Sequence, residues 1–594
     1  MTPHAQRLVD LRLALGQAGV DGFVLPRTDM YGSEYLPPGD ERVAWLTGFT
    51  GSAARVAILP DTAAVFTDGR YTLQVKDEVA QDLFETRHIL DEPLAEWLAE
   101  RVHEGMRIGY DPQLHLKADV ERLQKVLDRK GATLVALQTN PVDDVWLDRP
   151  SAPRAAMRAQ PPALAGETSL AKRQRLLAQV EPKAADGFFV STGDGVAWLL
   201  NLRGADIPFN PLCLGLCLVL PGARAVFLTD PAKRPQGFAF EDDGIALEPL
   251  DDRLALYAEL AHEGARILVD PAVTHLGLID ELTAAGLCVV EGTDPVGPAK
   301  ARKNKAEIAG AKRAQIVDGA AVTRFLAWLD RQTDVDELTA AAALEAERAK
   351  DLDYAGPSFD TISGAGPNGA IVHYRVSAHS NRKLERGSLY LVDSGGQYKD
   401  ATTDITRTVA IGEPTPEMRR RFTLVLEGHV ALATAVFPKD TRGSQLDVLA
   451  RRPLWEAGLD FDHGTGHGIG AALCVHEGPQ RIAKRGGDVK LEPGMIVSNE
   501  PGNYPTGQFG IRTENLMLVV ERGKPEGGDV DLLGFDILTL APIDRRLVEP
   551  TLLSPSARTW LDTYHARVRQ VLGPLLDTAD RAWLEEATAP LAAG

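Results

Sequence analysis

The sequence has few of the features that mark secreted, disulfide-rich or membrane proteins. Only 4 of its 594 residues are cysteine, too few for a disulfide framework in a chain of this size. Cys213 and Cys217 lie in the apolar run LCLGLCLVL and are expected to be buried. No segment approaches the roughly 18 uninterrupted apolar residues of a membrane span, and MTPHAQRLVDLR lacks the apolar core of a signal peptide. We therefore expect a cytoplasmic protein without membrane partners.

Basic residues are also outnumbered by acidic ones. Lys and Arg total 64 against 83 Asp and Glu, a net charge of −19. This charge is spread along the chain, which argues against nucleic acid or an anionic membrane surface as the main partner. With 44% hydrophobic and 25% charged residues, the composition is that of an ordinary globular protein. The length predicts roughly two to four domains.

An internal repeat divides the first half of the chain. Three short motifs recur in the same order: DGFVLPR (Asp21) and DGFFVST (Asp186), AWLTGFTG (Ala44) and AWLLNLRG (Ala197), AAVFTDGR (Ala63) and RAVFLTDPAKR (Arg224). They predict two copies of one domain. Apolar strands such as FVLP and AAVF alternate with amphipathic helices such as LAEWLAERVHEG, so each copy is expected to be α/β. The Pro- and Ala-rich stretch from Val142 to Glu167 is expected to be a linker.

After Pro298 the repeated motifs end and long helical patterns begin. AEIAGAKRAQIVDGAAVTRFLAWLD predicts a long amphipathic helix, and TDVD at Thr333 is an N-cap signature before an Ala-rich helix through Lys350. We expect domains at residues 1–150, 151–299 and 300–594. The third domain has no counterpart in the first two.

Two aspartates in this third domain lie among strand-forming residues. SLYLVDSGGQY contains Asp393 and TTDITRTVAIG contains Asp404, and both stretches are rich in β-branched or aromatic residues. They predict a hairpin or two adjacent strands. Burying carboxylates costs several kcal/mol unless something compensates, and a bound cation would do so. The alternative is a solvent-exposed face that carries two acids.

Further charged residues follow in Gly-rich segments. They are His463 and His467 in HGTGHGIG, His476 in VHEG, Glu500 in SNEPGNYP and Glu514 in FGIRTENL. Taken singly, each is more simply a loop histidine or a surface carboxylate. HGTGHGIG lacks the GK[ST] of a phosphate-binding loop, which argues against a nucleotide. Together, the apolar neighbours and turn glycines suit chain packed closely around a site.

The ordered motifs VDSG, TTDITRT, GTGHGIG, NEPG and IRTENL resemble the five-ligand dinuclear site of the pita-bread metallopeptidases. The matching positions are Asp393, Asp404, His467, Glu500 and Glu514. Within that family, the sequence is most similar to the long, three-domain cytosolic Xaa-Pro aminopeptidases. SEYLPPGDERVAWLTGFTGSA and FTDGRY near the start and WLDTYHARVRQVL near the end extend the resemblance. It implies two related creatinase-N-like α/β domains followed by a pita-bread catalytic domain with a C-terminal extension.

The resemblance also implies a ligand arrangement. Asp404 and Glu514 would bridge two metal ions, Asp393 would complete one ion, and His467 and Glu500 would complete the other. Four carboxylates and one imidazole suit Mn²⁺, with Zn²⁺ or Co²⁺ as alternatives. A hydroxide shared by the two ions would be the nucleophile.

Further roles are implied by the same family. Glu500 would handle the proton of the attacking water, and His373 and His476 would contact the substrate around the scissile carbonyl. The remaining expected substrate-binding positions are His463 and Tyr504 at the proline pocket, Arg512 beside the metals, and Arg70 of DGRY reaching from the first domain. For Arg70, bracing a turn is an equally simple role.

The expected activity is release of the first residue from peptides whose second residue is proline. Prolidase, which cleaves Xaa-Pro dipeptides, shares the ligands and is the main alternative. A catalytically inactive pita-bread binding module, or a metal-free hydrolase related to creatinase, is the alternative of another class. Methionine aminopeptidases lack the two preceding domains. The family also implies a homodimer whose N-terminal parts screen the site, so that it admits peptides and excludes folded proteins.

Overall fold

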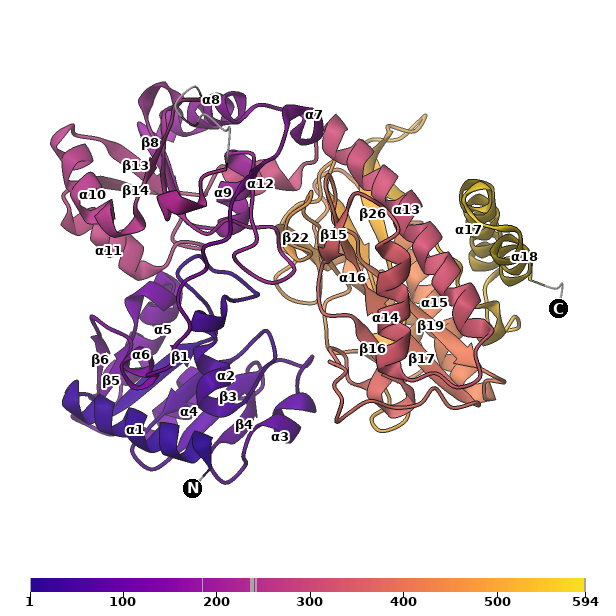
Figure 1. Ribbon diagram of the computed structural model, residues 1–594, viewed down its shortest axis with the longest axis horizontal. Helices are drawn as coiled ribbons and strands as arrows, with labels where there is room; N and C mark the ends of the chain where they lie inside the picture. The colour runs from indigo at the N-terminus through magenta and orange to yellow at the C-terminus, as the bar shows by residue number, and fades with distance from the viewer. Residues whose placement is uncertain (1, 184, 236–239, 241–242, 592–594) are drawn as a thin grey trace. The chain divides into compact units, whose positions relative to one another are not determined.

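The computed structural model of the protein describes residues 2–183, 185–235, 240 and 243–591 (Figure 1). The chain forms two compact units. The first comprises the residues before Ala163 together with Glu167–Val296, and the second comprises Ala163–Gly166 and the chain from Gly297 onward. Within the described residues, no helix is both long and apolar enough to cross a membrane.

The first unit contains two six-stranded mixed sheets. In one, the spatial order is β4-β3-β2-β1-β5-β6. Its strands are β1 (Gly22–Pro26), β2 (Arg55–Ile58), β3 (Ala63–Thr67), β4 (Glu85–His88), β5 (Arg107–Tyr110) and β6 (Thr133–Ala136). Its helices are α1 (Pro3–Gln17), α2 (Arg42–Thr47), α3 (Gln74–Glu78), α4 (Leu94–Arg101), α5 (Lys117–Asp128) and α6 (Pro141–Val145).

The second sheet repeats this topology, with the order β12-β11-β10-β8-β13-β14. Its strands are β8 (Gly187–Val190), β10 (Leu216–Val219), β11 (Ala225–Leu228), β12 (Ile245–Glu248), β13 (Arg266–Val269) and β14 (Cys288–Glu291), and its helices are α8 (Ser169–Val180), α9 (Gly193–Leu199), α10 (Arg253–His262) and α11 (Leu276–Ala284). The parallel and antiparallel pairs occur at the same positions as in the first sheet. The predicted duplication is therefore confirmed.

Alternation along the central strand places helices on both faces of the first sheet. Phe23 and Leu25 of β1 pack with Leu11 of α1 in one core. Val24 packs with Trp97 of α4 in another core. A strand buried on both faces explains the continuous apolar run FVLP. Cys217 in the corresponding sheet is fully buried, as expected.

The stretch expected to be a linker is only partly one. Val142 is fully buried in the core of the first sheet, and Trp146 stacks on Trp45 with ring centroids 5.3 Å apart. Farther along, β7 (Arg158–Ala159) pairs with β9 (Leu202–Arg203), and α7 spans Pro162–Ala165. The Pro-rich composition concealed these buried apolar side chains, so the prediction of a linker from Val142 was wrong.

The second unit is built on two larger antiparallel sheets. One has the order β16-β17-β19 and the other β20-β27-β26-β23-β21-β22. The strands are β16 (Ile362–Ala365), β17 (Ser388–Ser394), β19 (Ile405–Ile411), β20 (Val436–Pro438), β21 (Gly466–Gly468), β22 (Glu477–Ile482), β23 (Ile496–Asn499), β26 (Asn515–Gly523) and β27 (Leu532–Ile537). Two small pairs join β15 (Tyr354–Pro357) to β18 (Gly396–Tyr398) and β24 (Gly502–Asn503) to β25 (Ile511–Arg512).

Two pairs of helices pack against these sheets, and a third pair ends the chain (Figure 1). The pairs are α13 (Lys305–Asp330) with α14 (Glu337–Arg348), α15 (Pro416–Ala433) with α16 (Gly443–Glu456), and α17 (Pro555–Leu572) with α18 (Thr578–Ala587). The short helix α12 (Val296–Ala301) precedes them. α13 and α14 share a core with β17 and β19, while α15 and α16 share one with β23, β26 and β27. This mixed α/β unit accords with the expected pita-bread fold.

The two helices predicted at the start of this unit are present. α13 matches the quoted segment, and its N-cap Asn304 forms a capping box with Glu307. α14 begins later than the TDVD signature suggested, because Asp336 and not Thr333 is the N-cap. Asp336 itself is extended and forms a β-bridge with Lys383, so the helix begins only at Glu337.

Candidate metal centre

The first two candidate ligands lie on neighbouring strands. β17 and β19 pair antiparallel in the register Asp393–Thr406, as the sequence predicted for adjacent strands. Asp393 is within β17, whereas Asp404 immediately precedes β19. Both carboxylates are buried.

The other candidates come from the larger sheet. His467 is the central residue of β21, Glu500 follows β23, and Glu514 lies between β25 and β26. The backbone N–H of Glu514 donates to the carbonyl of Thr406, at 3.2 Å. This bond joins the segments that carry Asp404 and Glu514.

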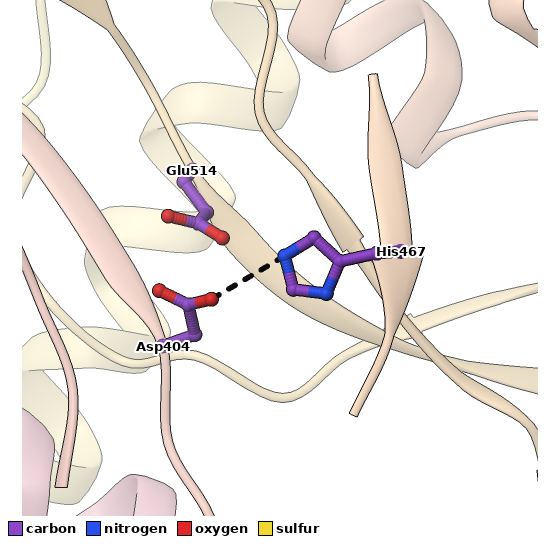
Figure 2. Close-up of side chains that lie close together, drawn as sticks. All are labelled: Asp404, His467 and Glu514. Atoms are coloured by element: carbon purple, nitrogen blue, oxygen red, sulfur yellow. Dashed lines mark ion pairs between the residues drawn. The ribbon is translucent and has the colours of Figure 1, made fainter. Parts of the chain in front are cut away.

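Three of the five side chains converge directly. Asp404, His467 and Glu514 each offer a ligand atom, and these atoms all lie within 4.8 Å of one another. Figure 2 shows the two carboxylates and the imidazole pointing toward a common centre. His467 Nε2 lies 3.5 Å from Asp404 Oδ2 and 3.4 Å from Glu500 Oε1. Glu500 therefore borders the same centre.

The imidazole of His467 is held by a hydrogen bond on the side away from the carboxylates. Its Nδ1 lies 2.9 Å from the carbonyl oxygen of Gly468. A carbonyl only accepts, so Nδ1 donates to it, and Nε2 is the ring nitrogen that faces the carboxylates of Asp404 and Glu500. The backbone N–H of His467 donates to Ser498 Oγ, which in turn donates to Glu500 Oε1.

The carboxylates are held where their charges repel. Burial, and then the charge of Asp393, raises the pKa of Asp404 well above its usual value. Burial, and then Asp404, does the same to the pKa of Glu514. Burial raises the pKa of Glu500 to about 7, although His467 acts in the opposite direction. A cation among these groups would remove the repulsion.

Unused acceptor atoms agree with a cation. Asp393 Oδ1, Asp404 Oδ1 and Glu514 Oε1 are buried without a hydrogen-bond partner. Buried acceptors without partners are rare and costly. The donor set and its free lone pairs fit a hard divalent ion.

Family models match most of the chain. Metallopeptidase family M24 matches residues 309–521, and the C-terminal region of peptidase M24 matches residues 531–591. Two models of the creatinase/prolidase N-terminal domain match residues 7–144 and 148–307.

Relatives extend this likeness to full length. A probable Xaa-Pro aminopeptidase P from Neosartorya fischeri is 38% identical over 99% of this chain and 92% of its own length. The chain belongs to metallopeptidase family M24. A further M24 relative with the same description, from Penicillium rubens, is 38% identical over 99% of both chains.

A solved structure has the same fold as this M24 chain. The X-prolyl aminopeptidase from Caenorhabditis elegans, described as a cytosolic enzyme with a di-nuclear active site, superimposes with a TM-score of 0.94. It is 33% identical over 100% of both chains. The likeness confirms two creatinase-like domains followed by an M24 catalytic domain.

Arg512 connects several predicted positions of this M24 site. Its Nη2 donates to Asp393 Oδ2 at 2.6 Å, and its Nη1 donates to Tyr504 Oη at 2.6 Å. The ion pair with Asp393 is almost fully buried. Arg512 Nη2 also lies 3.3 Å from the carbonyl of Val372, the residue before His373.

His463 and Tyr504 form an aromatic pair beside Arg512. Their ring centroids are 5.4 Å apart in an edge-on arrangement, and His463 Nε2 lies 2.8 Å from Tyr504 Oη. His463 Nδ1 lies 2.7 Å from the carbonyl of Gly464, to which it must donate. With the imidazole neutral, Nε2 accepts from the tyrosine hydroxyl.

The remaining predicted residues have different surroundings. The ring of His476 packs edge-on against that of His467, with centroids 4.4 Å apart. His373 lies half-buried in a turn. Arg70 belongs to the first unit, where its guanidinium binds both carboxylate oxygens of Asp68. Arg70 therefore braces its own turn, which is the alternative role considered for it above.

The sequence did not point to two residues that join the segments carrying the candidate ligands. Thr406 Oγ1 donates to Glu514 Oε2 at 2.8 Å and accepts from Arg512 Nε. Arg407 is buried and donates to the carbonyl of Glu514 at 2.6 Å and to Tyr564 Oη at 2.9 Å. Both residues belong to the quoted motif TTDITRT. Thr406 and Arg407 are successive polar residues in the buried strand β19 and so lie on its opposite faces. This pattern was the signal in the sequence that could have identified them.

Proposed function

We propose that the protein is a metal-dependent aminopeptidase that hydrolyses the N-terminal Xaa-Pro bond of peptides and releases the first residue. The convergence of Asp404, His467 and Glu514 with unpartnered buried oxygens carries this proposal. Full-length likeness to proteins described as Xaa-Pro aminopeptidases supports the substrate class.

Two divalent ions are proposed at the centre, most simply Mn²⁺, with Zn²⁺ or Co²⁺ as alternatives. We assign Asp404 and Glu514 to both ions, Asp393 to one, and His467 and Glu500 to the other. When bound, such ions act as Lewis acids that activate water and polarise the scissile carbonyl. The second oxygens of two carboxylates are already fixed: Arg512 holds Asp393 and Thr406 holds Glu514.

The chain's own groups then move protons and orient the peptide. Glu500 is assigned as the residue that accepts and returns the proton of the attacking water, and Ser498 fixes one of its oxygens. His476 and His373 are assigned to the substrate around the scissile carbonyl. The packing of His476 on His467 supports its place beside the reacting atoms.

Proline at the second position requires a dedicated site. The Xaa-Pro bond is a tertiary amide without an N–H, and its ring fixes the backbone. We assign His463 and Tyr504 to the walls of the proline pocket, because Arg512 and the Gly464 carbonyl lock both rings in place. Arg70 is assigned to the substrate from the first unit. Its bond to Asp68 would fix its guanidinium without using every N–H.

Metal restoration with three peptides tests this proposal. Protein stripped with EDTA is supplied with Mn²⁺, Zn²⁺ or Co²⁺, and Gly-Pro, Arg-Pro-Pro and Arg-Ala-Ala are followed by mass spectrometry. We expect metal-dependent release of arginine from Arg-Pro-Pro but not from Arg-Ala-Ala. Cleavage of Gly-Pro alone would instead indicate a prolidase. No cleavage with any metal would favour a binding module.

We propose a homodimer and a cytoplasmic location, the latter supported by the cytosolic origin given for the C. elegans enzyme. The domain limits 1–150, 151–299 and 300–594 are proposed from the sequence. Light scattering of the purified full chain would test the dimer, and a monomer at micromolar concentration would contradict it.

A further inference from the structure

Two buried lysines share one buried glutamate where the chain enters the second unit. Lys300, Lys303 and Glu477 are 4%, 5% and 3% exposed. Lys303 Nζ donates to Glu477 Oε1 and, at 3.0 Å, to the carbonyl of Lys300. Lys300 Nζ lies 2.9 Å from Glu477 Oε2, outside hydrogen-bonding geometry.

Stability alone does not explain this ion triad. Desolvating three charged groups costs free energy that their mutual attraction often fails to recover, and apolar side chains of similar volume are frequently as stable. The triad also has two cations for one anion. Such a group does, however, fix the positions of its members, because each lysine holds a different oxygen of Glu477 and the loss of either lysine leaves one buried carboxylate oxygen without its ion pair.

Its location relates that constraint to the metal centre. Glu477 is the first residue of β22, pairs with Gly468 across β21, and directly follows His476. The pairing register of β21 with β22 is irregular between His467 and Gly468. The backbone hydrogen bonds between these two strands therefore do not by themselves fix the positions of His476 and Glu477. The neighbouring rings of His467 and His476 are 4.4 Å apart.

We propose that Lys300 and Lys303 are positioning residues for His476 and act through Glu477. The two ammonium groups hold the Glu477 side chain in the protein interior. The peptide unit between residues 476 and 477 is thereby fixed, and the partly exposed His476 ring remains against His467. This inference rests on the proposed function, in which His476 contacts the substrate.

The principal variant is Lys300→Met. It removes one cation and leaves Lys303 and Glu477 as a neutral pair. We expect kcat for Arg-Pro-Pro to fall about 10- to 100-fold, the range found for displaced catalytic groups and their supporting residues. KM and the metal content should stay within about twofold. Glu477→Gln provides a second variant in case Lys300→Met does not fold.

Lys233→Met is the matched control. Lys233 is also a buried lysine bound to a buried carboxylate, Asp206, at 2.7 Å, but it belongs to the first unit. We expect the control to lower the unfolding temperature at least as much as Lys300→Met while leaving kcat unchanged. If kcat follows unfolding temperature in both variants, the triad is merely structural and the proposal is overturned.

A double-mutant cycle identifies the residue through which the triad acts. In a His476→Ala background, Lys300→Met should change kcat by less than about twofold, because the positioned ring is absent. The same fold-loss in both backgrounds would show that the triad does not act through His476. If the unaltered protein releases no arginine, the proposed function fails first, and the role assigned to His476 fails with it.

Discussion

Replacing Glu500 by glutamine should stabilise the metal-free protein at pH 8. Burial raises the pKa of Glu500 from its usual 4.5 to about 7, against the effect of His467. The folded protein thus holds this proton more tightly than the unfolded chain. The resulting stability is complete below pH 4.5 and is lost as pH rises through about 7. Glutamine does not ionise, so the glutamine variant should keep this stability at pH 8.

The size of the effect follows from that pKa. The difference between 4.5 and about 7 corresponds to about 3 kcal/mol at pH 8. This is an upper limit, because the Glu500 side chain remains 16% exposed and neighbouring carboxyl groups share the repulsion. We therefore expect a gain of about 2 kcal/mol. Glutamine keeps an oxygen that can accept the bond from Ser498.

Unfolding at two pH values, with and without metal, measures this gain. Without metal, the variant and the unaltered protein should unfold at similar temperatures at pH 5, and the variant several degrees higher at pH 8. With Mn²⁺ at 100 times its Kd, the unaltered protein should gain about 2.7 kcal/mol. The variant lacks a proposed ligand and should gain much less.

An exposed glutamate supplies the control. Glu492 pairs with Arg302 at the surface of the same unit, and Glu492→Gln should leave the unfolding temperature at pH 8 nearly unchanged, because substitutions at exposed positions change stability little. The reasoning is refuted if metal-free Glu500→Gln unfolds at or below the temperature of the unaltered protein at pH 8.

Three other substitutions test separate parts of the structure. Arg512→Lys should lower kcat/KM about 100-fold at constant protein concentration, because an ammonium cannot bind Asp393 in the same fixed geometry. Arg407→Lys should lower the free energy of unfolding in urea by about 2–4 kcal/mol, since the bond to Tyr564 is lost inside the core. Burial raises the pKa of Asp29 to about 6. The stability that protonated Asp29 gives is lost between about pH 4 and pH 6, so about half of a total of about 3 kcal/mol is still present at pH 5. Asp29→Asn should therefore weaken the fall in stability between pH 5 and pH 8 by about 1.5 kcal/mol.

Local patterns predicted the elements of the fold because their causes are local. β-branched residues flanking Asp393 and Asp404 indicated the paired strands β17 and β19. Repeated motifs indicated two domains of one topology, since apolar strands in one order build one kind of sheet. The limits of the linker were missed because the burial of Trp146 depends on a stacking partner, Trp45, 101 positions away.

In the candidate site, too, the sequence indicated the proposed ligand positions but not the contacts that support them. Five ligand positions were proposed from motif contexts, and three of them offer ligand atoms within 4.8 Å of one another. The contacts that support them could not be read from the sequence. Thr406 meets Glu514 across a separation of 108 residues, and Lys303 meets Glu477 across 174. Neither spacing has a helical or strand period that would reveal the contact.

The lysine–glutamate triad affects where the catalytic half can be cut from the rest of the chain. A fragment that begins at residue 309, where the M24 match starts, would carry all five proposed ligands. It would lack both lysines, leaving Glu477 as a buried anion without its cations, and it would lack the Asn304 cap of α13. Such a fragment could bind metal and still be a poor catalyst. A transplantable catalytic module should therefore begin before Gly297, within the last residues of the preceding domain.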